Sequence, residues 1–408
     1  MGNLPWLVLA LALMALSSAL GLPTWACVLI ALLIFGLSAL GPQGLADSLS
    51  SGLTDPWIWD LTVSVALIAI LGALMRELGQ VEDIARGLRG LGLRGRSLMA
   101  VSSALFGLLP VPGGAILSAS LVEEEEKALG MGVGGPATAN LLFRHLNFFA
   151  YPFSPALMFL ASPSMFNMDV FVLVLYLLPL SVAHVAASGL ASFALTHGRE
   201  LPPETGEARG RAAVELLRGL VPVLMAPLLK AILAPLGAPE LGFSIFVCAS
   251  IAASLLLARS QVNRASLVGA LRKSKAFNIA APVLLAMLFR DAFKASGVSS
   301  ELRAILASTP LPEVASYVLL CWALGLATGS AMLAMTVLPA GVSLAYGLSA
   351  YGGAVAGYII SPFHLCFIAT AEYFGLKQAR LYPRLLAYAA IMLASSAALA
   401  WAYGLLAL

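Results

Sequence analysis

Residues 107–120 read GLLPVPGGAILSAS, and residues 325–335 read GLATGSAMLAM. Each stretch places glycine, proline or hydroxyl residues in the middle of an apolar segment. A second break follows each one, FAYPFSPALMF at residues 149–159 and YIISPFHLCFI at residues 358–368. Such breaks stop a helix, because proline removes a backbone donor and glycine permits a sharp turn. We therefore expect two related halves, each with a broken tip followed by a broken helix.

The composition indicates an integral membrane protein. Of its 408 residues, 60% are hydrophobic and only 11% are charged, whereas soluble domains carry about 25% charged residues. Backbone groups in lipid must be satisfied within the chain, which leaves helices or a closed barrel. The apolar stretches are long and do not alternate with polar residues, so each is expected to be a helix of about 20 residues. The predicted fold class is an all-α polytopic membrane protein.

About ten transmembrane helices are expected, with two re-entrant helical hairpins between them. The hairpins are placed at 97–129 and 313–347, each folded about a Gly-rich centre. The first apolar segment has no basic start and no cleavage site, so it is read as a retained helix. The spans are placed at 4–20, 23–40, 57–75, 137–160, 169–195, 214–236, 241–258, 276–295, 350–374 and 383–407.

The distribution of basic residues tests whether the hairpins cross the membrane. Seventeen of the 23 Lys and Arg residues lie in four loops, which are 76–96, 197–218, 259–275 and 376–384. The loops 41–56 and 162–168 hold none. The positive-inside rule makes the four basic loops cytoplasmic. They fall on one side only if both hairpins are re-entrant, and this arrangement places both termini outside.

The two halves are expected to be repeats of opposite topology. The first covers 1–196, the second covers 214–408, and the polar, Pro/Gly-rich segment 197–213 is the cytoplasmic linker between them. Each unit holds five full spans, an odd number, so the second unit must enter the bilayer from the opposite face. Broken segments in inverted repeats are the best sequence indication of where a transporter binds its substrate.

Matching positions support the repeat. Gly113 in the first tip corresponds to Gly329 in the second at an offset of 216 residues. Ser154-Pro155 corresponds to Ser361-Pro362 at an offset of 207. The broken helices 137–160 and 350–374 are therefore taken as equivalent elements of the two units.

The tips are candidate substrate sites. Pro112, Gly113 and Gly114 end a helix in the first unit, and Thr328, Gly329 and Ser330 do so in the second, where they add hydroxyls. A new helix after each tip begins with unpaired N–H groups and the positive end of its dipole, which suit a carboxylate. The freed carbonyls, together with Thr328, Ser330 and Ser361 oxygens, suit a dehydrated Na⁺.

The broken spans contribute the remaining substrate-binding candidates. These are Ser154, Pro155, Ser361, Pro362 and His364. A single such break is commonly only a proline kink whose backbone groups are satisfied by neighbouring helices. Because the breaks come in two symmetric pairs, we favour a functional interpretation. His364 is expected to donate to substrate or carry a proton, or else to bond a carbonyl.

Other polar residues near the breaks have two interpretations each. Arg144 and His145 would attract an anion, although Arg144 could equally extend to the cytoplasmic interface. Asn140 and Asn147 would coordinate a coupling ion or form interhelical hydrogen bonds. Glu372 would be a proton-coupling group or, as we favour, a charge near the cytoplasmic interface.

The sequence indicates no cofactor and no metal beyond a possible coupling Na⁺. The four cysteines lie singly in apolar segments, and their spacing matches neither a metal site nor a disulfide framework. The net charge of +3 is too small to indicate nucleic acid. The expected partners are the lipid bilayer and a small anionic substrate.

Several motifs resemble one family of membrane proteins. They are PVPGGA, the segment FRH to YPFSPALM, GLATGS and SPFHLCFIATAEYF. Together they are similar to the uncharacterised prokaryotic family called domain of unknown function 401. That family is grouped in the ion transporter superfamily with divalent anion:sodium symporters and gluconate and citrate permeases. The resemblance implies two re-entrant hairpins, two discontinuous helices, a homodimer formed through a scaffold domain, and elevator-type alternating access. The expected location is the inner (cytoplasmic) membrane. The Ser-Asn-Thr tip signatures of the dicarboxylate symporters are missing here.

The leading functional hypothesis is a secondary active transporter of a small organic anion, coupled to Na⁺ or H⁺. An anion channel on the same scaffold is the alternative, although no ring of like charges favours it. An intramembrane enzyme is a weaker third hypothesis. HExxH, GxSxG and paired intramembrane acids are all missing from the sequence.

Overall fold

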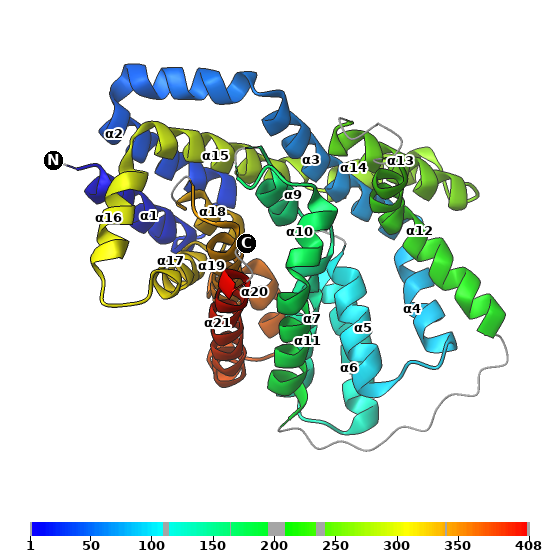
Figure 1. The fold of residues 1–408 in the computed structure, drawn as a ribbon. Coiled ribbons are helices and arrows are strands. Elements are labelled where there is room, and N and C mark those ends of the chain that lie inside the picture. The colour runs from blue at the N-terminus through cyan, green and yellow to red at the C-terminus, as the bar shows by residue number, and fades with distance from the viewer. Residues whose placement is uncertain are drawn as a thin grey trace.

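The computed structural model describes residues 2–108, 114–163, 165–194, 209–233, 241–338 and 341–405 (Figure 1). Every regular element in these residues is helical. The first half contains α1 (Leu4–Ala19), α2 (Thr24–Thr54), α3 (Pro56–Glu77), α4 (Gln80–Gly90), α5 (Gly95–Gly107), α6 (Gly114–Leu129), α7 (Gly134–Phe143), η1 (Arg144–Leu146), α8 (Asn147–Ala150), α9 (Pro155–Ala161), α10 (Val170–Tyr176) and α11 (Leu178–Phe193).

The second half is also helical wherever its described residues form regular elements. It contains α12 (Arg209–Leu233), α13 (Phe243–Leu257), α14 (Arg264–Lys273), α15 (Ala276–Ala295), α16 (Val298–Ser308), α17 (Glu313–Thr328), α18 (Ala331–Thr336), α19 (Leu344–Ile360), α20 (Leu365–Tyr373), η3 (Gln378–Arg380) and α21 (Tyr382–Leu405). The tip residues 109–113 and most of the expected linker 197–213 lie outside the described residues.

The chain is a multi-pass membrane protein. Six helical stretches of the described residues are long and apolar enough to span a bilayer, and a seventh results if α10 and α11, bent by 56°, are one span. Three shorter apolar helices accompany them, at Leu4–Ser17, Phe243–Leu257 and Glu313–Thr328. The six are Thr24–Thr54, Pro56–Glu77, Arg209–Leu233, Arg264–Ala295, Leu344–Tyr373 and Tyr382–Gly404.

Three expected loops are in fact largely helical. α2 does not end near residue 40: its backbone breaks at Gly41, which has φ of 70°, and Pro42 then starts a further helical stretch to Thr54. That stretch is rich in Gly and Ser, so its sequence suggested a loop. α4 and α14 likewise occupy the basic segments 76–96 and 259–275. A proline is well accommodated at the start of a helix, which explains the restart at Pro42.

The two expected hairpins differ in detail. In the first, α5 and α6 pack side by side (Figure 1). In the second, α17 ends at Gly329, which adopts a left-handed conformation, and the returning arm α18 has only six residues. α19 begins at Leu344, earlier than the expected 350, so the predicted boundaries 313–347 and 350–374 are displaced at this point.

Each broken span packs against the hairpin of the other half. α20, which follows the second break, contacts α6 and α7. α9, which follows the first break, contacts α18 and α3. The breaks are therefore enclosed by protein from both halves, which matters because irregular backbone at membrane depth is tolerated only inside protein or along a cavity.

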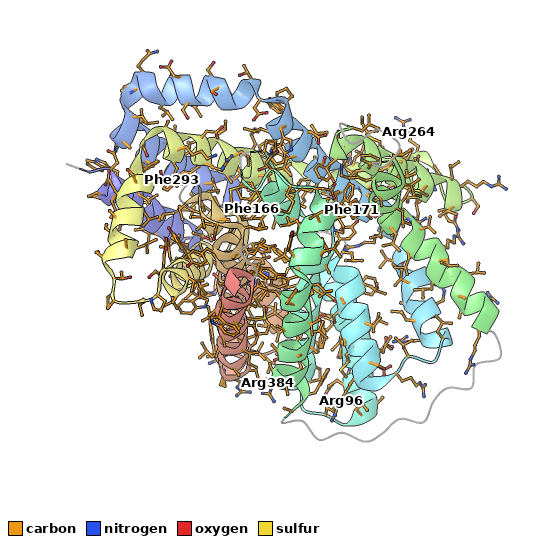
Figure 2. The ribbon with its side chains drawn as sticks, in the orientation of Figure 1. Arg96, Phe166, Phe171, Arg264, Phe293 and Arg384 are labelled. Atoms are coloured by element: carbon orange, nitrogen blue, oxygen red, sulfur yellow. The ribbon has the colours of Figure 1, made fainter. Side chains whose placement is uncertain are left out.

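Ion pairs connect several of the basic segments. Arg86 pairs with Glu215 at 3.7 Å, and Lys273 pairs with Glu77 at 2.7 Å. These ion pairs connect the segment 76–96 with α12 and α14, which lie far along the chain. Figure 2 places Arg96 and Arg384 at the lower end of the view and Arg264 at the upper right. Residues of different basic segments thus lie in different parts of this view. The cytoplasmic position of these segments stays a prediction.

Glycines allow α17 and α19 to approach closely. A Cβ added at Gly357 would lie 2.0 Å from the Trp322 carbonyl oxygen, and one at Gly325 would lie 2.3 Å from that of Ala354. Small residues at helix interfaces permit such backbone contact in membranes. This pair of helices fixes the second break relative to the second tip.

We predict that Gly357→Ala lowers the free energy of unfolding by about 1–3 kcal/mol, because the added methyl group forces α17 and α19 apart. Gly189→Ala in α11 is the matched control, since nothing lies within 4 Å of its Cβ position. It should be neutral or raise stability by up to about 1 kcal/mol. Unfolding in detergent measures both, and equal effects would contradict the proposed packing.

Candidate functional site

The two breaks are built as the same turn. In the first, the Ser154 N–H donates to the Tyr151 carbonyl oxygen at 2.8 Å. In the second, the His364 N–H donates to the Ser361 carbonyl oxygen at 3.1 Å. Each turn carries Pro-Phe at its centre and is followed at once by a helix, α9 or α20.

This geometry corrects the expected equivalence of Ser154-Pro155 with Ser361-Pro362. The structural counterpart of Ser154 is His364, which gives an offset of 210 instead of 207 (364 − 154 = 210). Pro155 is the first residue of α9, whereas Pro362 lies inside the turn. The Ser-Pro pair recurs at different positions of the two turns, so the matching letters do not mark equivalent residues.

The second break is tied to the second hairpin. The Ser361 hydroxyl donates to the Leu326 carbonyl oxygen at 2.7 Å and accepts from the Phe363 N–H at 3.2 Å. A Cβ at Gly329 would lie 3.3 Å from that of Phe363, so the tip rests directly on the break. Gly329 has φ of 62°, a conformation that suits glycine.

The hydroxyls of the second tip shape the turn itself. Thr328 Oγ1 accepts from the Ser330 N–H and donates to the Ser330 carbonyl oxygen, both at 3.2 Å. Ser330 Oγ accepts from the Leu333 N–H at 3.3 Å. Both oxygens retain a lone pair for a further partner.

A cavity of about 210 Å³ adjoins this tip and this break. Its polar lining includes Thr328, Tyr358, His364 and Cys366, and residues of α1 and α2 also line it. Concave sites lined mainly by apolar groups with a few converging polar groups are typical of small-ligand sites. The cavity lining brings Thr328, Gly329 and His364 together, and their role in binding stays a prediction.

The first break borders a different cavity of about 360 Å³ with a largely apolar lining. Asn147, Tyr151 and Pro152 line it, together with side chains of α5 and α12. Ser154 is buried beside this region, and its hydroxyl has no hydrogen-bond partner among the described residues. The Asn147 amide oxygen is likewise buried without one.

Two predicted polar residues connect α7 and η1 to their neighbours. The Asn140 amide donates to the Ala115 carbonyl oxygen at 3.1 Å and to Thr370 Oγ1 at 3.2 Å. Its own carbonyl oxygen is buried without a partner in the described part of the chain. Arg144 is 5% exposed and donates to Ser118 Oγ at 3.1 Å, so its side chain does not extend to an interface.

His145 and His364 meet in the protein interior. Their Nε2 atoms lie 3.1 Å apart, although the residues are 219 positions apart in sequence. The Tyr358 ring packs on His364 with centroids 4.1 Å apart. His145 therefore belongs with the second break, which the sequence did not predict.

The remaining candidates fall elsewhere. Pro112 and Gly113 lie outside the described residues, and Gly114 is the first residue of α6. Glu372 is exposed near the end of α20, about 12 Å along the helix from His364. Tyr358 and Cys366 were missed, because an aromatic and a lone cysteine in apolar segments carry no distinguishing pattern.

Comparison with known proteins identifies relatives of this chain. The family described as "Protein of unknown function (DUF401)" matches residues 12–405. The crystal structure of the YdaH transporter of Alcanivorax borkumensis, described as having an unusual topology, resembles the structure with a TM-score of 0.54 and 15% sequence identity. The likeness covers 90% of this chain and 89% of that one, and it concerns the fold. No curated protein matches the sequence.

We predict that Ser361→Ala lowers the free energy of unfolding by about 1–2 kcal/mol, because the Leu326 carbonyl and the Phe363 N–H lose their partner. Ser349→Ala in α19 provides the control, since its buried hydroxyl has no partner in the described residues. The comparison uses thermal or denaturant unfolding in detergent. If both variants unfold alike, the hydroxyl does not hold the break to the hairpin.

Proposed function

Because this chain belongs to the DUF401 family and shares the fold of the YdaH transporter, we propose that it is a secondary active transporter of a small organic anion. The observation that carries the proposal is the pair of matching turns at Tyr151–Ser154 and Ser361–His364, each interrupting a helix inside the protein. Discontinuous helices of this kind form the substrate and ion sites of many transporters.

We propose that the substrate binds in the cavity beside the second tip. A carboxylate there would lie beside Thr328 and His364. To bind it, Thr328 or His364 would exchange its hydrogen bond to the Ser330 or Ile359 carbonyl oxygen for one to the substrate. The volume of about 210 Å³ suits a small organic anion better than a drug-sized molecule, for which cavities of about 300–1,000 Å³ are usual. Arg144, buried one residue before His145, would supply the positive charge that favours an anion in this region.

We propose coupling to a gradient of Na⁺ or H⁺. Three buried oxygens without partners in the described residues, on Asn140, Asn147 and Ser154, support Na⁺ because it prefers oxygen ligands. Alternating access would be of the elevator type, with the two hairpins and broken spans moving against the remaining helices, in a homodimer of the inner membrane.

We predict that purified protein in proteoliposomes accumulates a radiolabelled carboxylate when an inward Na⁺ or H⁺ gradient is imposed. Gly329→Leu should abolish uptake, since the side chain would be strained at φ of 62° and would meet Phe363. Gly189→Leu adds the same volume at an open position and should leave uptake unchanged. Flux that never exceeds equilibration under either gradient would indicate the channel alternative.

We also predict that a recognised carboxylate raises the apparent stability of the protein, and that Na⁺ enhances the effect if it is the coupling ion. At a ligand concentration 100 times Kd, binding to the native state alone adds about 2.7 kcal/mol. A thermal-shift series of carboxylates, each measured with Na⁺ and with choline, tests this. A shift that is the same in both salts would argue against Na⁺.

A further inference from the structure

Three metal-binding side chains converge at the second break. His145 comes from η1, and His364 and Cys366 come from the start of α20. One ligand atom from each, two imidazole nitrogens and one sulfur, lies within 4.8 Å of the other two. Both histidines are buried and the cysteine is partly buried. The arrangement therefore joins two broken spans from opposite halves of the chain.

Hydrogen bonds orient both imidazoles. His145 Nδ1 lies 2.6 Å from the Leu141 carbonyl oxygen, and His364 Nδ1 lies 3.1 Å from that of Ile359. A carbonyl oxygen can only accept, so each Nδ1 carries the proton of the neutral ring. Each Nε2 then carries a lone pair, and the two Nε2 atoms face each other at 3.1 Å.

Two opposed lone pairs repel, so the contact becomes favourable when a proton or a metal ion lies between them. Metal-binding histidines usually donate the N–H of one ring nitrogen to a backbone carbonyl or another acceptor, and bind the metal through the other nitrogen. Here Nδ1 makes that hydrogen bond and Nε2 is free for a metal. The site therefore has the orientation of metal ligands as well as their proximity.

The donor atoms select the ion. Imidazole nitrogen and thiolate sulfur suit Zn²⁺ and related transition metals, whereas Na⁺, Mg²⁺ and Ca²⁺ prefer oxygen. On a tetrahedral zinc with Zn–N bonds of about 2.0–2.1 Å, two nitrogens lie about 3.4 Å apart. The observed separation of 3.1 Å is close to this value.

We propose that His145, His364 and Cys366 bind one Zn²⁺ ion at the junction of the two broken spans. Each histidine would bind through Nε2, and Cys366 would bind as thiolate after its thiol proton passes to solvent. Three protein ligands leave a fourth position open, as in zinc sites that accept an exogenous ligand. His364 and Cys366 also line the 210 Å³ cavity, which places that position within reach of a small anion.

The test uses untagged, full-length protein in detergent, first treated with a chelator and then titrated with Zn²⁺ by calorimetry and with Co²⁺ by absorption. The wild type should bind one ion per chain, and its Co²⁺ form should show a thiolate-to-cobalt charge-transfer band. No substrate is needed, so the outcome is independent of whether the protein transports an anion.

Cys366→Ser should lose the charge-transfer band and bind Zn²⁺ at least about tenfold more weakly, and His364→Gln should weaken binding similarly. Cys248→Ser removes an exposed cysteine elsewhere and should bind as the wild type does. Cys366→Ser is a small change at a partly exposed position, so it remains informative if His364→Gln fails to fold. Wild-type protein without bound metal, or unchanged binding by Cys366→Ser, would overturn the site and leave a shared proton as the positive species.

Discussion

The structure depends on how backbone groups are satisfied where helices stop inside a membrane protein. A free N–H or carbonyl exposed to lipid would cost several kcal/mol. A turn at each break meets this requirement. The Ser154 N–H donates to the Tyr151 carbonyl oxygen, and the His364 N–H donates to the Ser361 carbonyl oxygen. The second break adds a side-chain bond from Ser361 to the Leu326 carbonyl oxygen. The second break is thus held by the hairpin of its own half, and each broken span is also covered by elements of the other half.

The sequence predicts much of this arrangement because its apolar segments and their interruptions are visible in composition alone. It places the second tip, both breaks and most of the described helices near their observed locations, whereas residues 109–113 of the first tip lie outside the described residues. It fails where a helix is polar or short: α4, α14 and the continuation of α2 beyond Gly41 lack the long apolar run that identifies a span. The register of the repeat failed for another reason, since two Ser-Pro pairs of identical letters occupy different positions of the turn.

The candidate site was less predictable because its members are distant in sequence. Thr328, Gly329 and His364 share a cavity as expected from their two motifs. The approach of His145 to His364 arises from packing between α7–η1 and α20, which no spacing rule contains. Cys366 is distinguished from the other cysteines by the two imidazole nitrogens that lie near its sulfur. Proximity created by the fold, and not local pattern, assembles this cluster.

The breaks in the two halves share one backbone turn, but the side chains around them differ in chemistry. The structural counterpart of His364 is Ser154, and the cavity at the first break is largely apolar, whereas the cavity at the second break gathers a hydroxyl, an imidazole and a thiol. Because the matching turns satisfy the same backbone groups, their side chains are free to diverge without loss of the fold. The shared turn shows how both breaks satisfy their backbone groups, and the polar side chains beside the second break support the proposal that a ligand binds there.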